Sequence, residues 1–478
     1  MKKQISIILL SCLFINSLAQ SSFQLTIQNE EDQIPTSLIE DVNGNIICSI
    51  FDQPDAHLIK INNDGAIIDS LKIESPFNGD CNISEFIKSN NDYFVAFGEY
   101  NTDNEYFLWN LKLDFDLNIL ENHLFTVPDK IMGNYLNCIK NSMGNYVVAA
   151  SYGQEINNRD IFIYEIDTNG LIINENYWGG NSPGVKLIFD IAEQAKGKLF
   201  LTCNSGNLEK NEWCDLYELD SNLNIINLHV INNISLYNDI KFIEDSIYLL
   251  SGLIHYGTLD SQIKLLKIKS PNSVLDSIEF GKLGNDTVDY PGFHNNISYI
   301  LEQNIYYGGT SNLDLFNPFF SNTPSWLILA KLTDSFNVYW QNFYGGDACY
   351  NLLTILATQD GGCVMAGTRY DYQTQNQERD VYILKVNEDG ILTWTNNFPE
   401  TTRQVIVYPN PGQYEIMIKS ISPNLIFELF DIQGVKMLSK KIATEDRIDT
   451  KDLPQGMYIY QVLNPQAEII ETGKWIKN

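Results

Sequence analysis

The sequence repeats a pattern of four short apolar segments, and the period of this repeat constrains the fold more than any other feature. Each repeat has two apolar segments, a polar loop, an alternating segment, an Asn/Asp/Gly turn and a closing segment. The turns fall at Gly65, Asn118, Gly170, Asn224, Ser273, Asn337 and Gly390. Four strands per ~50 residues is the period of a propeller blade, which cannot bury both its faces alone. An all-β fold is therefore predicted, with a β-propeller of about seven blades over residues 20–400.

The seventh repeat is the clearest, with Asp360-Gly361-Gly362 as its first turn, Asp380–Val386 as its third strand and Ile391–Trp394 as its closing strand. This stretch resembles the surface-propeller repeats of Bacteroidota. Closure of the ring is open at this point. Phe23–Gln28 either adds an outer strand to the last blade or belongs to an incomplete eighth.

Both ends of the chain differ from the repeats. Lys2 and Lys3 precede the apolar run Ile5–Ile15, and Ser17-Leu18-Ala19 supplies small residues for cleavage, so residues 1–19 are predicted to be a secretory signal peptide. No later segment is long and apolar enough to span a bilayer, and we expect no membrane span in the mature chain.

The last 75 residues predict a separate module of about seven short strands. From residue 404 to the end the sequence has eight basic and nine acidic residues, whereas the whole chain carries a formal charge of −29. The upstream part therefore holds −28 of that charge. This shift in composition indicates a boundary near residue 400 and a small Ig-like β-sandwich over residues 404–478.

Four motifs in this module carry a family resemblance: Tyr408-Pro409-Asn410-Pro411, Phe427–Gly434, Leu453–Tyr458 and Gly473–Lys477. Together they resemble the type A C-terminal sorting domain of the Bacteroidota type IX secretion system. The resemblance implies that the secretion machinery is a partner, and that the chain passes the periplasm to reach the cell surface or the medium. The sorting positions would be Tyr408, Pro409, Asn410, Pro411, Gly434, Gly456, Tyr458 and Lys474.

Candidate ligand-binding residues lie in loops that a propeller brings to one face, those between second and third strands and those between blades. They pair aromatic rings with carboxylates, a composition suited to glycan or peptide binding. The candidates are Trp178, Phe316, Phe319, Phe320, Trp326, Tyr344, Asp347, Tyr370 and Tyr372. Packing between blades is the alternative explanation for Trp178 and Tyr344. The long sixth loop exceeds what the fold requires, which favours function there.

Cofactors are expected to be absent. The Asn/Asp-rich turns at Asn62–Gly65, Asp114–Asp116 and Asp167–Gly170 offer oxygen ligands for Ca²⁺, but they also suit tight hairpins, and none has the spacing of a twelve-residue calcium loop. The five histidines have no paired-ligand spacing. Of the cysteines, Cys203 and Cys214 form the most plausible disulfide, because they flank one loop.

These features exclude some functions and leave others open. The strong negative charge argues against binding to nucleic acid or to an anionic membrane. No catalytic motif is present, so a non-catalytic glycan- or protein-binding propeller is the favoured interpretation. An extracellular hydrolase or lyase acting on polysaccharide or peptide is the alternative.

Overall fold

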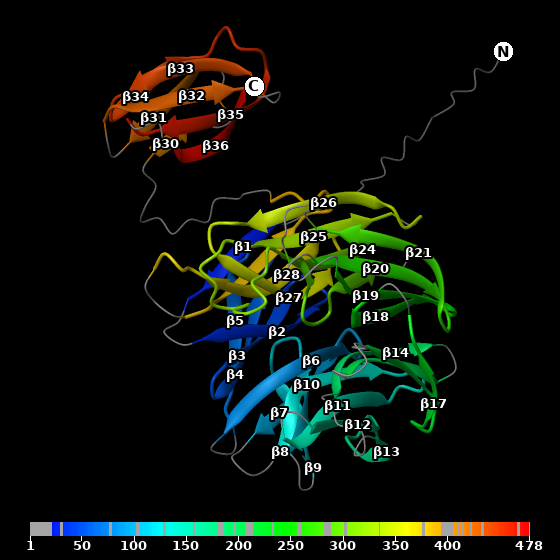
Figure 1. Cartoon of the computed structure of the whole chain (residues 1–478). Coiled ribbons are helices and arrows are strands. Elements are labelled where there is room, and N and C mark those ends of the chain that lie inside the picture. The colour runs from blue at the N-terminus through cyan, green and yellow to red at the C-terminus, as the bar shows by residue number, and fades with distance from the viewer. Residues whose placement is uncertain are drawn as a thin grey trace, which may run out of the picture. The chain divides into compact units, whose positions relative to one another are not determined.

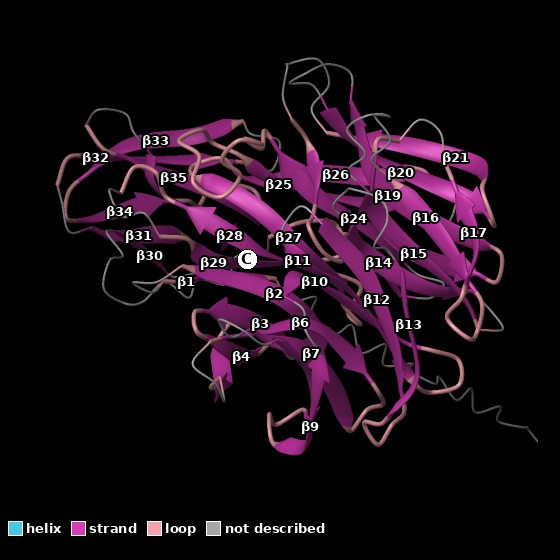
Figure 2. Ribbon diagram, turned by 60° about the horizontal axis from the view of Figure 1, so that its bottom comes forward, coloured by secondary structure: helices cyan, strands magenta, loops and turns pink. Residues whose placement is uncertain are grey.

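The computed structural model describes residues 22–477 except for short gaps, and all its regular elements are strands (Figures 1 and 2). The gaps are 29–31, 76–78, 102–105, 128–130, 156–157, 179–185, 195–196, 206–213, 232–233, 256–260, 282–287, 301–303, 334, 375–377, 393–404, 409–411, 413, 421–422, 432–434 and 466–468. Contacts divide the chain into two units, Met1–Trp394 and Thr395–Asn478, which are described separately.

The first unit contains seven antiparallel sheets, the blades. Blade 1 is β2 (Gln33–Glu40), β3 (Ile46–Asp52), β4 (Asp55–Ile61) and β5 (Ile67–Ile73). Blade 2 is β6 (Asp80–Lys88), β7 (Tyr93–Asn101), β8 (Tyr106–Asp114) and β9 (Ile119–Val127). Blade 3 is β10 (Ile131–Lys140), β11 (Tyr146–Glu155), β12 (Asn158–Ile166) and β13 (Ile172–Trp178). Blade 4 is β14 (Lys186–Gln194), β15 (Lys198–Ser205), β16 (Asp215–Leu219) and β17 (Ile225–His229).

The remaining blades follow the same order with two variations. Blade 5 is β18 (Leu236–Glu244), β19 (Ile247–His255), β20 (Ser261–Lys269) and β21 (Ser273–Phe280). In blade 6 the first strand is split into β22 (Tyr290–Pro291) and β23 (Ile297–Ile300), followed by β24 (Asn304–Ser311), β25 (Trp326–Leu332) and β26 (Val338–Gly345). Blade 7 is β27 (Cys349–Ala357), β28 (Cys363–Tyr370), β29 (Asp380–Val386) and β1 (Phe23–Ile27).

The blades form a closed ring. The innermost strands contact one another in the order β2, β6, β10, β14, β18, β23, β27 and back to β2. The predicted seven-bladed propeller is therefore confirmed. The open question about Phe23–Gln28 is settled as well, because β1 pairs antiparallel with β29, from Phe23 opposite Lys385 to Ile27 opposite Val381. The closing strand expected at Ile391–Trp394 is wrong, since residues 391 and 392 are not in a strand and 393–394 lie outside the described residues.

Burial follows the position of a strand in its blade. Every residue of β29, the third strand of blade 7, is buried, whereas in β5, the outermost strand of blade 1, all but two residues are exposed. Stacked blades bury both faces of their inner strands, so third strands read as nearly continuous apolar runs. Only in the fourth strand of a blade do buried and exposed side chains alternate, and there only weakly. This strand leaves aliphatic side chains such as Ile68 and Leu120 about half exposed.

Neighbouring blades interlock at the turn between third and fourth strands, where one residue takes a positive φ. At Gly65 this φ is +81°, and a Cβ there would lie 2.7 Å from Phe23 of the preceding blade. Gly170 and Gly390 receive His123 and Trp340 in the same way. Elsewhere the position holds a large apolar residue that fills the space itself, namely Leu117, Leu223 or Phe336, each almost fully buried.

The joint between blades 4 and 5 lacks this interlock. The turn of blade 5 contains Pro271 and has no residue of positive φ, and β17 ends early at His229. A groove of about 270 Å³ remains there, lined by Val230, Ile231, Lys264, Leu266, Asn272, Val274 and Ser277. The missing interlock thus coincides with an open groove at this joint.

Asx-type turns explain the Asn/Asp-rich segments. Asp167 Oδ1 accepts hydrogen bonds from the backbone N–H of Asn169 at 2.9 Å and of Leu171 at 2.8 Å. Asn62 and Asp114 accept the same pair of bonds two and four residues on. These oxygens thus serve the hairpins.

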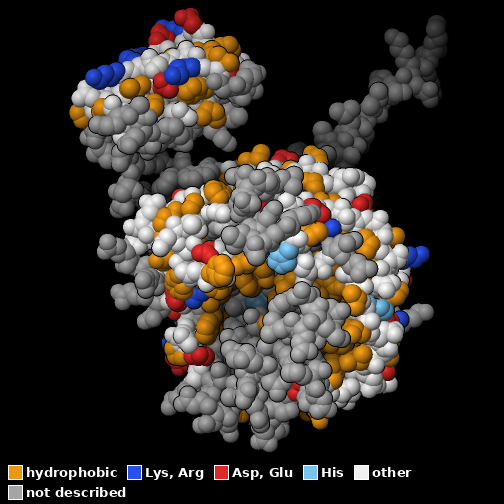
Figure 3. Space-filling view, in the orientation of Figure 1, with side chains coloured by type: hydrophobic (Ala, Val, Ile, Leu, Met, Phe, Trp, Pro, Cys, Tyr) orange, Lys and Arg blue, Asp and Glu red, His pale blue; other side chains and the backbone are white. Residues whose placement is uncertain are grey.

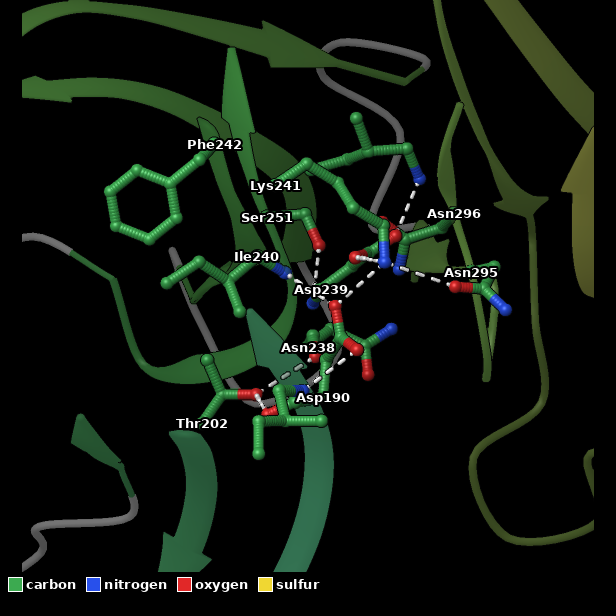
Figure 4. A network of polar contacts seen from close by, with 12 residues as sticks. Asp190, Thr202, Asn238, Asp239, Ile240, Lys241, Phe242, Ser251, Asn295 and Asn296 are labelled. Atoms are coloured by element: carbon green, nitrogen blue, oxygen red, sulfur yellow. Dashed lines mark hydrogen bonds and ion pairs between the residues drawn. The ribbon is translucent and has the colours of Figure 1, made fainter. Parts of the chain in front are cut away.

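A buried polar network joins four blades across the ring, and Figure 4 shows the part of it that blades 4, 5 and 6 form. It lies at a bulge in the inner strands: Glu85 and Asp190 follow the register shift in blades 2 and 4, and Asp239 lies within the shift in blade 5. Lys241 Nζ lies 2.9 Å from Asp190 Oδ2, 3.0 Å from Asp239 Oδ1 and 3.1 Å from the Asn295 side-chain oxygen of blade 6. Asn295 Nδ2 in turn donates to Glu85 Oε2 at 3.0 Å.

The network holds more carboxyl groups than cations, and burial shifts their proton affinities. Burial raises the pKa of Glu85 to about 7, against the opposing charge of Lys241. Burial also raises the pKa of Asp190, and the neighbouring Asp239 adds to this effect although Lys241 counteracts it. Burial by itself would lower the pKa of Lys241, but Asp190 and Asp239 raise it above its ordinary value. The ammonium of Lys241 thus stays charged, and Glu85 and Asp190 keep their protons to a higher pH than exposed carboxyl groups do.

The predicted disulfide between Cys203 and Cys214 is wrong. All seven described cysteines are free thiols. Cys203 lies opposite Asp215 in the sheet, so Cys203 and Cys214 face opposite sides of blade 4. Cys203 packs toward blade 3, whereas Cys214 packs toward blade 5 and its thiol donates to the Ser235 carbonyl at 2.9 Å.

The second unit consists of two antiparallel sheets around one core. One sheet has the order β30 (Val405–Tyr408), β31 (Glu415–Ser420) and β34 (Glu445–Asp449). The other has the order β33 (Lys436–Ile442), β32 (Leu425–Phe430), β35 (Gly456–Leu463) and β36 (Ile469–Lys477). Phe427, Tyr460 and Trp475 lie in the core between them. The predicted seven strands are present.

The raised pKa of Glu85 predicts a pH-dependent stability. Between pH 4.5 and 7 the unfolded chain releases this proton while the folded protein keeps it, so the free energy of unfolding falls as pH rises through this range. Replacing Glu85 by Gln removes this titration. The change in the free energy of unfolding that the substitution causes should therefore be more favourable at pH 7.5 than at pH 4.5, by roughly 2 kcal/mol. Urea unfolding at both pH values measures this difference. The matched control is Glu74→Gln, at a side chain that is 78% exposed, and a pH-independent effect of Glu85→Gln would contradict the assignment.

Closure by β1 predicts a stability cost for losing its anchor. Phe23 is 7% exposed and fills the space beneath Gly65 of blade 1. Phe23→Ala should lower the free energy of unfolding of the propeller by about 3 kcal/mol, as for other buried Phe-to-Ala changes. The urea midpoint followed by tryptophan fluorescence reports this loss. Gln24→Ala, at the adjacent exposed position of β1, should leave the midpoint unchanged, and an equal loss for both variants would refute anchoring by Phe23.

Candidate functional site

The candidate site is formed by loops at one end of blades 6 and 7. Residues 312–325 join β24 to β25, the longest connection between second and third strands in the ring, and we call them the blade-6 loop. Residues 371–379 make the corresponding connection in blade 7. In antiparallel four-stranded blades, the connections between second and third strands lie at the same end of the ring as the segments that join one blade to the next. These two loops therefore lie close to each other and to those joining segments.

The blade-6 loop is held by hydrogen bonds within itself. Asp314 Oδ1 accepts the backbone N–H of Phe316 at 3.0 Å, and Asp314 Oδ2 accepts the Ser321 hydroxyl at 3.1 Å. Asn317 Nδ2 donates to the Phe320 carbonyl at 2.7 Å, and Asn312 Nδ2 donates to the Pro324 carbonyl at the same distance. The loop is therefore a built structure, and its apex presents Phe316 with 91% of its surface exposed.

An arginine from blade 7 fixes this loop to the ring. The guanidinium carbon of Arg379 lies 4.7 Å from the ring centroid of Phe319 and 4.8 Å from that of Phe320, so the cation is sandwiched between two rings. The backbone N–H of Arg379 donates to Asp32 Oδ1 at 3.0 Å, and its Nη2 lies 3.4 Å from Asp32 Oδ2. Such a partly buried contact is worth more than an exposed one.

Further rings extend the sandwich on both sides. Phe293, which follows β22, stacks on Phe319 with centroids 5.9 Å apart, and Tyr290 lies 5.4 Å from Phe293. On the other side Tyr370 meets Phe320 edge to face at 5.3 Å. Three of the predicted residues, Phe319, Phe320 and Tyr370, are thus brought into one cluster.

Asp347 lies beside this aromatic cluster and belongs to a separate group of polar side chains. It accepts a hydrogen bond from Tyr350 at 2.7 Å and pairs with Arg369 at 3.0 Å, and Arg369 also reaches Asp371 at 3.4 Å. Burial opposes ionisation of Asp347, but Tyr350 and Arg369 lower its pKa below the usual value. Asp347 is therefore an anion with a 64% exposed side chain. Tyr372 follows Asp371 and is half-buried.

The other predicted residues have mainly structural contacts. Trp178 lies at the joint of blades 3 and 4, with its ring centroid 6.4 Å from that of Tyr217. Tyr344 donates to the Gly390 carbonyl at 2.8 Å and packs against blade 7. Trp326 occupies the space beside Gly346, whose Cβ would meet the indole nitrogen. Packing between blades therefore accounts for the environments of Trp178 and Tyr344, and packing at the end of blade 6 for that of Trp326.

The sequence reasoning missed charged residues of the site. Arg379, Arg369 and Asp32 were not among the candidates, because isolated charged residues have no signal in one sequence. Arg379 directly precedes the third strand of the best-defined repeat, close to the Tyr370-Asp371-Tyr372 segment that was singled out. That proximity was the only available hint. Phe293 was missed because it lies where the inner strand of blade 6 is interrupted.

The sorting positions lie in the second unit, partly among described residues. Tyr458 is buried, its hydroxyl donates to the Pro454 carbonyl at 2.7 Å, and its ring is 5.9 Å from Trp475. Gly456 begins β35 with a φ of +152°. Tyr408 ends β30 and Lys474 lies in β36. Pro409, Asn410, Pro411 and Gly434 lie outside the described residues.

Within the described ranges, no three His, Cys, Asp or Glu side chains gather where they could hold a metal ion. The expected absence of a cofactor stays a prediction, with Ca²⁺ at the Asn/Asp-rich turns as the alternative. Over the same part of the chain, no helix has the length and apolar character needed to cross a membrane. In Figure 3 hydrophobic side chains (orange) lie at the surface of the first unit with acidic ones (red) among them.

Solved structures similar to this chain include propeller proteins of low identity. A catalytically inactive virginiamycin B lyase from Staphylococcus aureus is 14% identical, with 76% of this chain and 99% of that chain covered and a TM-score of 0.47. An N11 neuraminidase-like protein from a flat-faced bat strain is 10% identical, with 78% and 96% covered and a TM-score of 0.39. The fold assignment here rests on the sheet order and the closed ring of contacts.

Curated proteins include no match to this chain. The family model described as "Secretion system C-terminal sorting domain" matches residues 406–478, which is the second unit from β30 onward. This agrees with the resemblance of the four sequence motifs. The chain is therefore a β-propeller protein with a type IX secretion C-terminal sorting domain, and it is exported to the cell surface or released.

Proposed function

We propose that the propeller is a non-catalytic binding module that captures an extracellular glycan or protein with its loop face. The observation that carries this proposal is Phe316, a phenyl ring 91% exposed in a loop that is held by internal hydrogen bonds and by the stacking of Phe319 and Phe320 on Arg379. Exposing a large apolar side chain is unfavourable in water, and a rigid loop binds without an ordering cost. Central aromatic residues on rigid supports are typical binding hot spots.

The environments of the carboxyl groups support binding over hydrolysis. A glycosidase needs one carboxyl group that stays protonated and one that is ionised, both facing the substrate. At the loop face Asp347 has a lowered pKa and is paired with Arg369. Glu85 and Asp190, whose pKa values are raised, belong to the buried network that joins the blades. The pKa values of Glu40 and Asp380 are also raised by burial, and both residues are only 6% exposed. Asp380, which follows Arg379, accepts a hydrogen bond from Gln28 at 3.4 Å, so this carboxyl group is buried rather than open to a substrate.

The binding proposal predicts that one side chain controls ligand capture. The purified protein should retain at least one member of a panel of extracellular polysaccharides and cell-surface proteins, and Phe316→Ala should weaken that binding about tenfold, as for a hot-spot truncation. Phe343→Ala is the matched control, because it removes a phenyl ring that is 41% exposed on β26 of the same blade. Equal binding by both variants, no binding by the wild type, or release of products from the panel would count against the proposal.

The sorting domain predicts a compartment-specific defect. Deleting residues 404–478 should leave the propeller in the periplasm, because the segment matched to the sorting family is gone. Immunoblotting of periplasmic, surface and medium fractions measures the distribution. Phe316→Ala should be exported normally, which separates export from binding. Undiminished export of the truncated chain would show that the second unit is not needed.

A further inference from the structure

We propose that the ligand of the blade-6 loop is a protein segment rich in arginine or lysine, and that the ring of Phe316 takes up one of its cationic side chains. This inference rests on the binding function proposed above and narrows it to one class of partner. It follows from three observations on the loop and its surroundings.

The loop already binds a cation of this kind within its own chain. Phe319 and Phe320 enclose the Arg379 guanidinium at 4.7 and 4.8 Å, with Asp32 as its anion. Aromatic faces are negative at their centre, so they attract guanidinium and ammonium groups that they partly desolvate. Phe316 is a third phenyl group in the same loop, and it presents its faces to solvent rather than to a side chain of the ring.

The position of Phe316 is fixed before any partner arrives. Its backbone N–H is bound by Asp314, and the next residue, Asn317, is bound to Phe320 of the arginine sandwich. Asn351 of β27 also donates to the Pro318 carbonyl at 3.3 Å, which connects the loop to blade 7. A ring held in this way loses little conformational freedom on binding.

The exposed charge around the loop is negative. Asp347 and Asp32 have side chains that are 64% and 41% exposed, whereas those of Arg369 and Arg379 are only 17% and 11% exposed. The ends of the loop are joined to the Asp347 segment by backbone hydrogen bonds, Ser325 N–H to the Ala348 carbonyl at 3.1 Å and Gly346 N–H to the Ser325 carbonyl at 3.0 Å. The exposed charges on the segments joined to this loop thus favour a cationic partner over an anionic one. The chain as a whole, at −29, attracts the same partners over a longer range.

The test uses labelled hepta-arginine as the probe and the full-length mature protein. Fluorescence anisotropy at 150 mM NaCl should show binding that weakens about fivefold in both Phe316→Ala and Phe316→Leu, because leucine keeps the apolar volume but lacks the aromatic face. Phe343→Ala, which leaves the charge and the loop intact, should bind within twofold of the wild type. Hepta-glutamine should not bind.

Two results would overturn the inference. Unchanged binding of hepta-arginine by Phe316→Ala would mean that only the net charge attracts the peptide, and full binding by Phe316→Leu would mean an apolar contact. If Phe316 still controls capture from the polysaccharide and protein panel in either case, the proposed binding function stands and only the partner class fails. A neutral polysaccharide captured through Phe316, with no response to hepta-arginine, would assign the site to a glycan instead.

Discussion

The ring depends on how neighbouring blades pack at the turn between third and fourth strands. In six of the seven blades a residue of positive φ at this turn decides the arrangement. Glycine leaves room for a ring from the preceding blade, as Gly65 does for Phe23 and Gly390 for Trp340. In other blades Leu117, Leu223 or Phe336 takes this strained conformation and fills the joint itself. The cost of a positive φ in these residues is offset by burying a large apolar side chain.

Lysines of the third strands add a polar tie to the same joints. Lys60 Nζ donates to the Phe115 carbonyl of the next blade at 2.7 Å and lies 3.2 Å from Asp41 of its own blade. Lys331 reaches Glu388 of blade 7 at 2.8 Å in the same manner. In blade 4 the corresponding position is Glu218, which turns back to Lys198 and His229 of its own blade. In blade 3 the corresponding Glu165 likewise accepts hydrogen bonds from Asn141 and Asn145 of its own blade, so the polar tie is made at some joints and not at others.

Much of this architecture could be predicted because its signals are periodic. The spacing of the turns gave seven blades, and four ordered motifs gave the sorting domain. The closing strand was wrongly predicted at Ile391–Trp394. That segment and β1 are both short and rich in apolar residues, and only the pairing of β1 with β29 shows which of the two completes the blade. Cys203 and Cys214 are close in sequence but face different blades, a fact that depends on register.

The candidate site was predicted less completely than the fold. The residues that the sequence did not indicate all act through contacts between distant segments of the chain. Phe319, Phe320 and Tyr370 could be proposed because aromatic loops have a visible composition. Arg379 and Asp32 could not, because their role depends on a contact between segments from opposite ends of the propeller. The network of Glu85, Lys241 and Asn295 has the same origin, since each residue comes from a different blade. Interactions of this kind leave no local pattern.

The outermost strand of the last blade has a consequence for biogenesis. Gln28, just after β1, donates to Asp380 across a separation of 352 residues, so the earliest strand of the propeller needs almost the last one as its partner. Bringing such distant segments together is slow and costs chain entropy. A polypeptide that is still being threaded from one compartment into another has its beginning and its end on different sides. In such a passage the circle can close only once β29 has joined β1 in the same compartment.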